Sequence, residues 1–173
     1  MGTRGLTIVK VDGETKVAQY GQWDHYPSGQ GVTVLDFLKN FNEEQFRNQL
    51  KKCQFIDNKK QEEIDHYLKS IGSNNGWMSI EQSELYHVKY PYLSRDHGAG
   101  ILNLINESED ETIWIQDSID FKNQYPCEGV YTVDLDNRTF TIEWDDYEYV
   151  FNINDLPTTE EFLTICEPEE EEF

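Results

Sequence analysis

The sequence predicts an α+β fold in which an N-terminal β-hairpin and a C-terminal antiparallel meander share one sheet, with a helical block packed on one face. Three observations predict it. Asp12-Gly13 separates two β-rich runs, apolar residues in the middle of the chain recur at helical spacing, and apolar and polar residues largely alternate along 139–144 and 147–153. The sheet and the helices therefore come from different parts of the chain.

The first predicted element is a hairpin of Leu6–Val11 and Thr15–Tyr20 around Asp12-Gly13, a dipeptide that suits the left-handed conformations of a tight hairpin turn. The segment Gly21–Gly31 follows. Its proline and three glycines interrupt both helical and strand periodicity, so we expect a loop.

Four helices are predicted next, each with a plausible cap or stop signal. Val34–Phe41 has helical spacing, Asn42 and Asp57 can cap the second and third helices, and Ser79 can cap a fourth near Ile80–Val88. Gly72 ends the third helix and Pro91 stops the fourth, while Gly98–Ile105 predicts a further short helix.

The rest of the chain is predicted to be mainly strand. The expected strands are Thr112–Gln116, Val130–Leu135, Thr139–Trp144 and Tyr147–Ile153, with tight turns at Asp136-Asn137 and Asp145-Asp146. Alternation places Phe140 and Ile142 on the core side and acidic residues on the solvent side. Thr158 or Thr159 can cap a last helix, with Phe162, Leu163 and Ile165 facing inward.

Composition indicates one domain, which we place at residues 1–166, followed by an acidic tail at 167–173. Apolar residues make up 37% of the 173 and aromatic residues 13%, enough for a core.

There is no membrane-length apolar run or signal-peptide pattern, so we expect a cytoplasmic protein, in the host cytoplasm if it is phage-encoded. The three cysteines and four histidines never approach zinc-ligand spacing, so we expect reduced thiols, no metal and no cofactor.

The net charge of −20 is concentrated in the second part of the chain. Residues 107–173 hold 21 acidic and two basic residues, whereas residues 1–106 hold 13 and 12. Such a field disfavours nucleic acid as a direct partner and favours a protein with a basic surface. The alternative is that the charge only serves solubility. The predicted acidic interaction face comprises Asp134, Asp136, Glu143, Asp145, Asp146 and Glu148.

Two polar segments could hold a site. The loop at 20–31 is aromatic and polar and leads into a helix, and Ser94–Gly100 combines a cation, a carboxylate and an imidazole. The structural alternatives are a loop plugged by Trp23 and Tyr26, and a pairing of Arg95 with Asp24 while Asp96 caps a helix. An N-terminal nucleophile at Thr3 or a catalytic Cys127 lacks a supporting motif.

Several of these segments carry a resemblance. Met1–Gly5, Val17–Asp24 and Tyr26–Gly31, followed by Leu93–Ala99 and Cys127–Asp136, resemble motifs of a family of uncharacterised proteins found in tailed phages, bacteria and some fungi. In that pattern glycine is usual where His25 stands, and a Trp-Ala pair is usual near Gly129-Val130. The resemblance implies an origin and no established activity. Its polar residues predict one pocket, formed by Arg4, Gln22, Asp24, Tyr26, Ser28, Arg95 and Asp96.

The sequence therefore favours a non-catalytic, phage-type interaction protein that inhibits a host protein, such as a defence protein, by occupying a basic, nucleic-acid-binding surface. The alternative function is binding or hydrolysis of a small molecule, for example a nucleotide-like anion, at Arg4, Asp24 and Arg95. We expect neither direct nucleic-acid nor membrane binding, and the oligomeric state is left open.

Overall fold

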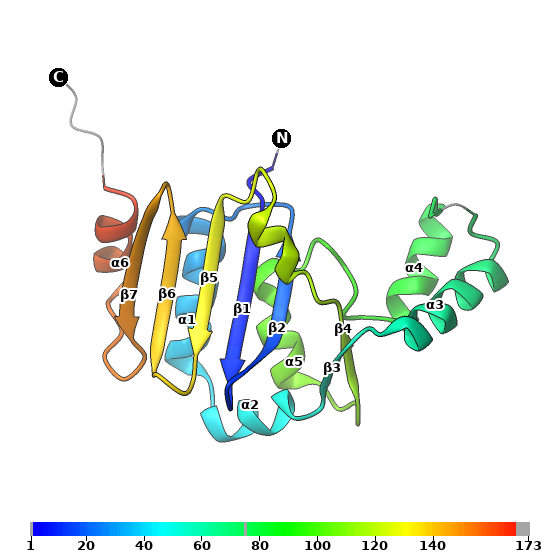
Figure 1. Cartoon of the computed structure of the whole chain (residues 1–173), viewed down its shortest axis with the longest axis horizontal. Coiled ribbons are helices and arrows are strands. Elements are labelled where there is room, and N and C mark those ends of the chain that lie inside the picture. The colour runs from blue at the N-terminus through cyan, green and yellow to red at the C-terminus, as the bar shows by residue number, and fades with distance from the viewer. Residues whose placement is uncertain (1, 75, 169–173) are drawn as a thin grey trace.

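A five-stranded sheet forms the centre of the molecule. The computed structural model describes residues 2–74 and 76–168 (Figure 1). The sheet has the strand order β2-β1-β5-β6-β7, so the N-terminal hairpin lies beside the C-terminal meander as predicted. The α+β prediction is thus confirmed. The predicted tail residues 169–173 lie outside the described residues.

The N-terminal hairpin consists of β1 (Gly5–Val11) and β2 (Glu14–Gly21). Its turn has positive φ angles at Asp12 (55°) and Gly13 (74°), which is the geometry that the Asp-Gly pair predicts. The register runs from Gly5 opposite Gly21 to Val11 opposite Glu14, with an irregularity between Val9 and Lys10.

The meander consists of β5 (Gly129–Asp134), β6 (Thr139–Trp144) and β7 (Tyr147–Asn152). Strand β1 pairs with β5 in parallel, so this join differs from the antiparallel pairing within both hairpins. The predicted alternation holds, because Phe140 and Ile142 are fully buried. Both Asp145 and Asp146 have positive φ, which gives β6 and β7 a two-residue turn.

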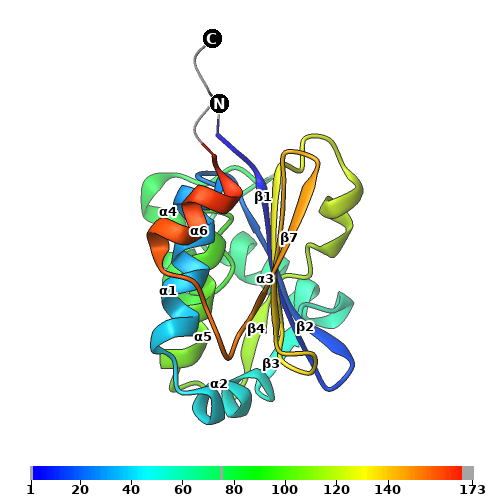
Figure 2. The same ribbon diagram turned by 90° about the vertical axis from the view of Figure 1, so that its left-hand side faces the viewer.

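One face of the sheet is covered by α1 (Val32–Asn40), α5 (Ile101–Glu107) and α6 (Thr159–Cys166), and α2 (Glu43–Leu50) crosses below its end (Figure 2). Buried residues from these helices and from the inner face of the sheet form one core cluster. Its members include Val34, Leu35, Phe46, Ile101, Leu102, Tyr131, Phe140 and Phe162. Burial of these apolar side chains holds the helices on the sheet.

A short segment covers part of the other face. Segment η3 (Ile119–Asn123) lies over β1 and β2, where Phe121 packs edge-on against Tyr20 at 4.8 Å between ring centroids. Leu6, Ile8 and Val130 form a second, smaller apolar cluster beneath it. The outer face of β6 and β7 has no such cover among the described residues (Figure 2).

A second, two-stranded sheet was not predicted. Strand β4 (Ile113–Ile115) falls within the expected strand at 112–116, but it pairs in parallel with β3 (Cys53–Phe55). Strand β3 has only three residues and follows two lysines, so its alternation is too short to recognise in the sequence.

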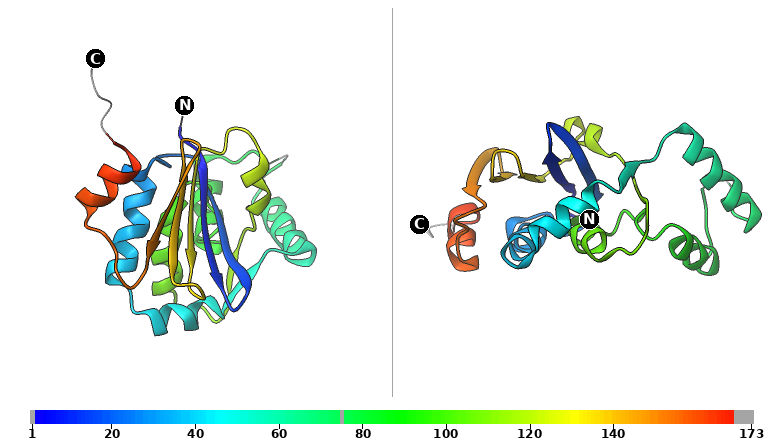
Figure 3. Two further views of the ribbon diagram at one scale, coloured as in Figure 1. Left: turned by 60° about the vertical axis from the view of Figure 1, so that its left-hand side comes forward. Right: turned by 90° about the horizontal axis from the view of Figure 1, so that it is seen from below.

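Helices α3 (Asn58–Ser70) and α4 (Ile80–Lys89) pack on each other and project from the side of the molecule, away from the sheet face expected for the whole helical block (Figure 3). The Tyr67 hydroxyl donates to the Leu85 carbonyl at 3.2 Å. The predicted caps are present: Asp57 accepts from the Lys60 amide, and Ser79 forms a reciprocal capping box with Gln82.

The last helix corrects one residue of the prediction. Thr158 caps α6 as expected, and Phe162 is fully buried. Ile165, however, is 45% exposed, while Cys166 is buried in its place. Residues 162 and 166 are one helical turn apart and share a face, whereas residue 165 lies to the side of that face.

We predict that Phe162→Ala lowers the free energy of unfolding by about 3–5 kcal/mol, because the fully buried Phe162 ring packs against two other aromatic rings and its removal leaves a cavity. The Phe162 ring stacks on Phe140 at 6.0 Å and contacts Phe151 at 5.6 Å between centroids. Urea unfolding followed by fluorescence measures the loss. Ile165→Ala in the same helix is the control and should cost about 1 kcal/mol or less; equal losses would contradict the placement of α6.

Candidate functional site

The loop after β2 closes one end of the sheet with a buried histidine. His25 is 0% exposed. Its Nδ1 lies 3.1 Å from the Trp23 carbonyl oxygen, and its backbone amide donates to the Thr3 carbonyl at 3.3 Å. The Tyr131 hydroxyl donates to the His25 carbonyl at 2.6 Å. The loop is therefore tied to both β1 and β5 at their amino ends.

Three glycines make room for this histidine. A Cβ atom at Gly5 or Gly21 would overlap the His25 ring, and one at Gly129 would overlap its carbonyl oxygen. Because these glycines open β1, close β2 and open β5, they come together only once the sheet has formed. From the sequence, His25 was expected only to lie in a loop. The glycines at strand ends were the signal for it, but their spacing in the sequence forms no motif.

Burial lowers the pKa of His25 to about 4, against hydrogen bonds and the Asp24 charge, which raise it. The ring is therefore neutral near pH 7. Its Nε2 has no hydrogen-bond partner in the part of the chain that the structure describes. Since the side chain has no exposed surface, we interpret His25 as a packing residue that holds the loop.

The main chain brings the segments of the predicted polar pocket together. The Gln22 amide donates to the Arg95 carbonyl at 3.3 Å, and the Arg4 carbonyl accepts from the Glu128 amide at 2.9 Å. Gln30 adds a link that was not predicted: its Oε1 accepts from the Ala99 amide at 2.9 Å. This contact joins η1 (Pro27–Gly31), a π-helical turn where a loop was expected, to η2 (Gly98–Gly100), a 3₁₀ turn where a helix start was expected.

The side chains of that set do not form a joint contact. Arg95, Asp96 and Asp24 are exposed, and no ion pair found among the described residues includes them or Arg4. Ser28 donates to the Glu167 carboxylate, and Tyr26 packs edge-on against Trp144 at 6.1 Å. Nor does Asp96 cap η2, whose N-cap is His97. A shared polar pocket therefore stays a prediction.

The predicted acidic residues divide between the two ends of the meander. Asp134 and Asp136 lie at the β5–β6 turn. The Asp134 carboxylate accepts from the amides of Asp136 and Asn137 at 3.0 Å, and Asp136 accepts from the amides of Asp12 and Gly13 at 2.9 and 2.8 Å. Both carboxylates thus brace turns, and Asp136 connects the two hairpins.

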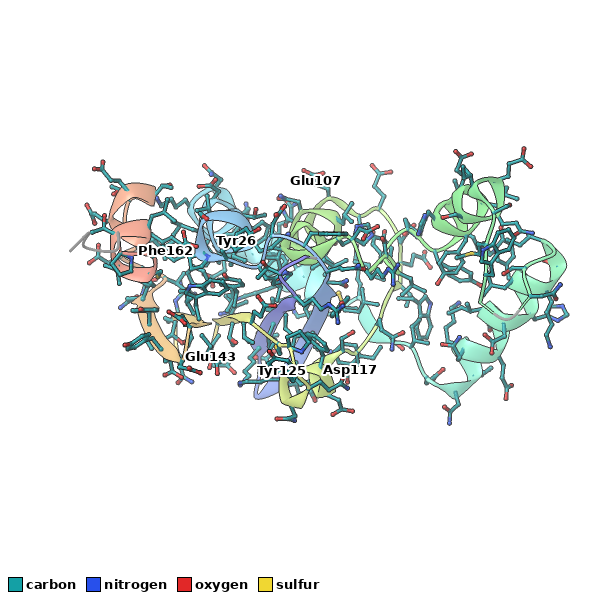
Figure 4. All side chains as sticks on the ribbon, turned by 90° about the horizontal axis from the view of Figure 1, so that it is seen from above. Tyr26, Glu107, Asp117, Tyr125, Glu143 and Phe162 are labelled. Atoms are coloured by element: carbon teal, nitrogen blue, oxygen red, sulfur yellow. The ribbon has the colours of Figure 1, made fainter. Side chains whose placement is uncertain are left out.

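The other four predicted acids gather at the opposite end, around an open depression of about 380 Å³ that we call the acidic hollow. It is lined by Lys122, Cys127, Glu128, Val130, Glu143, Trp144, Asp145, Asp146, Tyr147 and Glu148. Glu128 was not among the predicted residues. Glu143 and Glu148 lie directly opposite each other on β6 and β7. Figure 4 shows Glu143 on the same side of the molecule as Asp117 and Tyr125, away from Glu107 and Phe162.

Most of the negative charge is not neutralised locally. Lys122 pairs with Glu143 at 3.2 Å across the acidic hollow. Elsewhere in residues 2–74 and 76–168, the carboxylates found in ion pairs are those of Glu14, Glu43 and Glu63. Asp145, Asp146 and Glu148 are exposed and have no such partner within these ranges. The acidic hollow can therefore accept hydrogen bonds from ammonium or guanidinium groups.

Neither the cysteine thiols nor the metal-ligating residue types form a recognisable catalytic site among the described residues. Burial raises the pKa of Cys127, and the Glu143 charge adds to that effect. Burial also raises the pKa of both Cys53 and Cys166 to about 12, and all three cysteines are free. Within the described residues, no group of three or more histidine, cysteine or acidic side chains could hold a metal ion. No helix in that part of the chain could cross a membrane.

Comparisons with protein-family models, with curated proteins and with solved structures find no match to the chain. The resemblance to the phage and bacterial family accordingly stays a prediction, and the site has to be interpreted from its own geometry.

We predict that His25 makes stability fall with decreasing pH. The unfolded chain binds a proton at His25 near pH 6.5 and the folded protein only near pH 4, so the stability contributed by the neutral ring is complete above about pH 6.5 and is lost as the pH falls. Between pH 7.5 and 5 the loss is about 2 kcal/mol. The measurement is urea unfolding of the unmodified protein and of His25→Asn at pH 7.5 and at pH 5. Because all other titrating groups are the same in the two proteins, the difference between them isolates the contribution of His25. Parallel pH profiles would contradict it.

Proposed function

We propose that the protein is a non-catalytic interaction protein that inhibits its partner by occupying a basic, nucleic-acid-binding surface with the acidic hollow. One observation carries the proposal: Glu128, Glu143, Asp145, Asp146 and Glu148 line a single depression, and among the described residues that line it Lys122 is the only basic one. A basic surface that contacts phosphates would find carboxylate oxygens there instead.

The geometry supports recognition by this end of the sheet. Asp145 and Asp146 occupy a two-residue turn, and Glu143 and Glu148 are on paired strands, so the backbone already holds these four acidic residues together. Preorganised groups lose little conformational entropy on binding. With a net charge of −20 on 173 residues, the long-range field also speeds encounter with a basic partner.

The same field argues for a protein as the partner. Every phosphate of a nucleic acid would be repelled by the acidic hollow, and an anionic membrane surface would be repelled in the same way. A host protein that handles nucleic acid, such as a defence nuclease, carries the complementary charge. The phage origin that the resemblance implies would make this partner a host protein.

We predict that neutralising the acidic hollow weakens partner binding roughly tenfold to a hundredfold, because each exposed charge pair contributes up to about 1 kcal/mol. The variant combines Glu143→Gln, Asp145→Asn, Asp146→Asn and Glu148→Gln. Asparagine tolerates the positive φ angles of residues 145 and 146, so the turn is kept. Partners captured from host lysate on the immobilised protein are then measured by calorimetry against both forms.

The matched control removes four exposed carboxylates away from the acidic hollow, through Glu62→Gln, Glu84→Gln, Glu107→Gln and Glu109→Gln. Its net charge equals that of the hollow variant. The proposal requires that the control binds like the unmodified protein, that binding falls at about 0.5 M salt, and that the complex excludes DNA from the partner. Equal losses in the two variants would mean that net charge alone acts, and binding of DNA alongside the protein would contradict the inhibitory role.

A further inference from the structure

Strand β7 is an edge of the five-stranded sheet. It pairs with β6 through six residue pairs without a bulge, from Thr139–Asn152 to Trp144–Tyr147. It contains no proline, glycine or lysine. Edge strands of natural proteins usually carry such features, because unpaired backbone groups invite another strand. Residues 147–151 of β7 carry no bulge, proline or lysine, and Glu148 is their one charged side chain.

The hairpin register shows which backbone groups are free. In a two-residue hairpin the flanking pair is hydrogen-bonded and the next pair is not, so Tyr147, Tyr149 and Phe151 bond to β6. The amides and carbonyls of Glu148 and Val150 therefore point away from the sheet. No hydrogen bond from the described residues reaches them. At the far end, the Asn152 carbonyl accepts from the Asp155 amide at 3.0 Å, which closes the edge there.

The opposite edge of the sheet is treated differently. On β2 the Ala18 carbonyl accepts from the Ser118 amide at 2.9 Å, the pairing with β1 is irregular near Val9, and the β3 strand lies alongside. Strand β7 lacks such cover, and its side chains are correspondingly exposed: Tyr147 is 65% and Val150 57% exposed. The open backbone of Glu148–Val150 also adjoins the acidic hollow through Glu148 and Tyr147.

We infer that β7 binds an extended, lysine- or arginine-containing segment of the partner by strand addition. The basic character of that segment rests on the function proposed above, whereas the open edge does not. The charge of this surface favours a basic segment over a second copy of the chain as the occupant. A second copy of this chain would bring another net charge of −20 to Asp145, Asp146 and Glu148, while a basic segment neutralises them.

The register also indicates the pattern of the added strand. On the outer face, Glu148 is followed two residues later by Val150, which lies opposite Thr141. A neighbouring strand would therefore place a lysine or arginine beside Glu148 and an aliphatic or β-branched residue beside Val150 on the same face. Main-chain hydrogen bonds to Glu148 and Val150 provide the pairing, and the alternate side chains provide the preference for basic sequences.

The test uses an eight-residue synthetic peptide in which lysine and valine alternate on one face and threonine fills the other. Three control peptides are used. One replaces lysine by glutamate, and the other two carry N-methyl groups on the backbone amides of one edge or of the opposite edge of the peptide strand. Amide hydrogen exchange by NMR is expected to slow at least ~tenfold at Glu148 and Val150 with the lysine peptide. The glutamate peptide should leave amide exchange at Glu148 and Val150 unchanged. At least one of the two N-methylated peptides should leave it unchanged as well.

Two variants at one position separate backbone from side chain. Val150→Pro removes an outward amide without removing a bond to β6, and should abolish peptide binding, while Val150→Thr keeps the amide and should retain it. Lysine-peptide binding that is unaffected by both N-methylation and Val150→Pro overturns strand addition but leaves the acidic hollow as a binding surface. Protection by the glutamate peptide equal to that by the lysine peptide overturns the basic partner. If sedimentation shows a dimer that Val150→Pro dissociates, the occupant is a second copy of this chain, and the proposal of a basic partner segment is overturned.

Discussion

The parallel pairing of β1 with β5 is the constraint on which the rest of the structure depends. Six residue pairs, from Gly5–Gly129 to Lys10–Asp134, join segments more than 120 positions apart. This pairing places the meander beside the N-terminal hairpin, and it makes β2 and β7 the two edges of the sheet. It also brings Gly5, Gly21 and Gly129 around His25, whose burial then fixes the loop that leads into α1.

Local chemistry accounts for the elements that the sequence predicted well. The Asp12-Gly13 and Asp145-Asp146 turns, the Asn42, Asp57, Ser79 and Thr158 caps, and the alternation around Phe140 all depend on residues close together in the chain. Long-range pairing accounts for what was missed. The β3–β4 pair joins Cys53–Phe55 to Ile113–Ile115, and no local sequence pattern predicts this pairing.

The candidate site shows the same division. Alternation predicted that Glu143 and Glu148 face solvent, and they do, but it could not show that Asp134 and Asp136 would be used in turns at the other end of the meander. Glu128 joins the acidic hollow only because the segment after η3 runs back to β5. The polar set around Arg4 and Asp24 is close in the main chain, yet its side chains point to different partners.

The acidic residues and the open edge together describe a surface suited to a basic, extended partner. The β6–β7 hairpin supplies both, since its turn carries Asp145 and Asp146 and its outer strand carries the free amides. A bulky cover such as η3 protects β1 and β2 on the outer face, and the described residues leave β6 and β7 without an equivalent. The acidic hollow and the β7 edge are therefore parts of one continuous surface, joined at Tyr147 and Glu148.

Amide hydrogen exchange in the free protein tests this account most directly. If β1 pairs with β5 and β7 is an open edge, the amides at the centre of β1 and β5 exchange slowest of all. Along β7, Tyr149 and Phe151 are then protected while Glu148 and Val150 exchange quickly. Slow exchange at Glu148 and Val150, or fast exchange throughout β5, would contradict it.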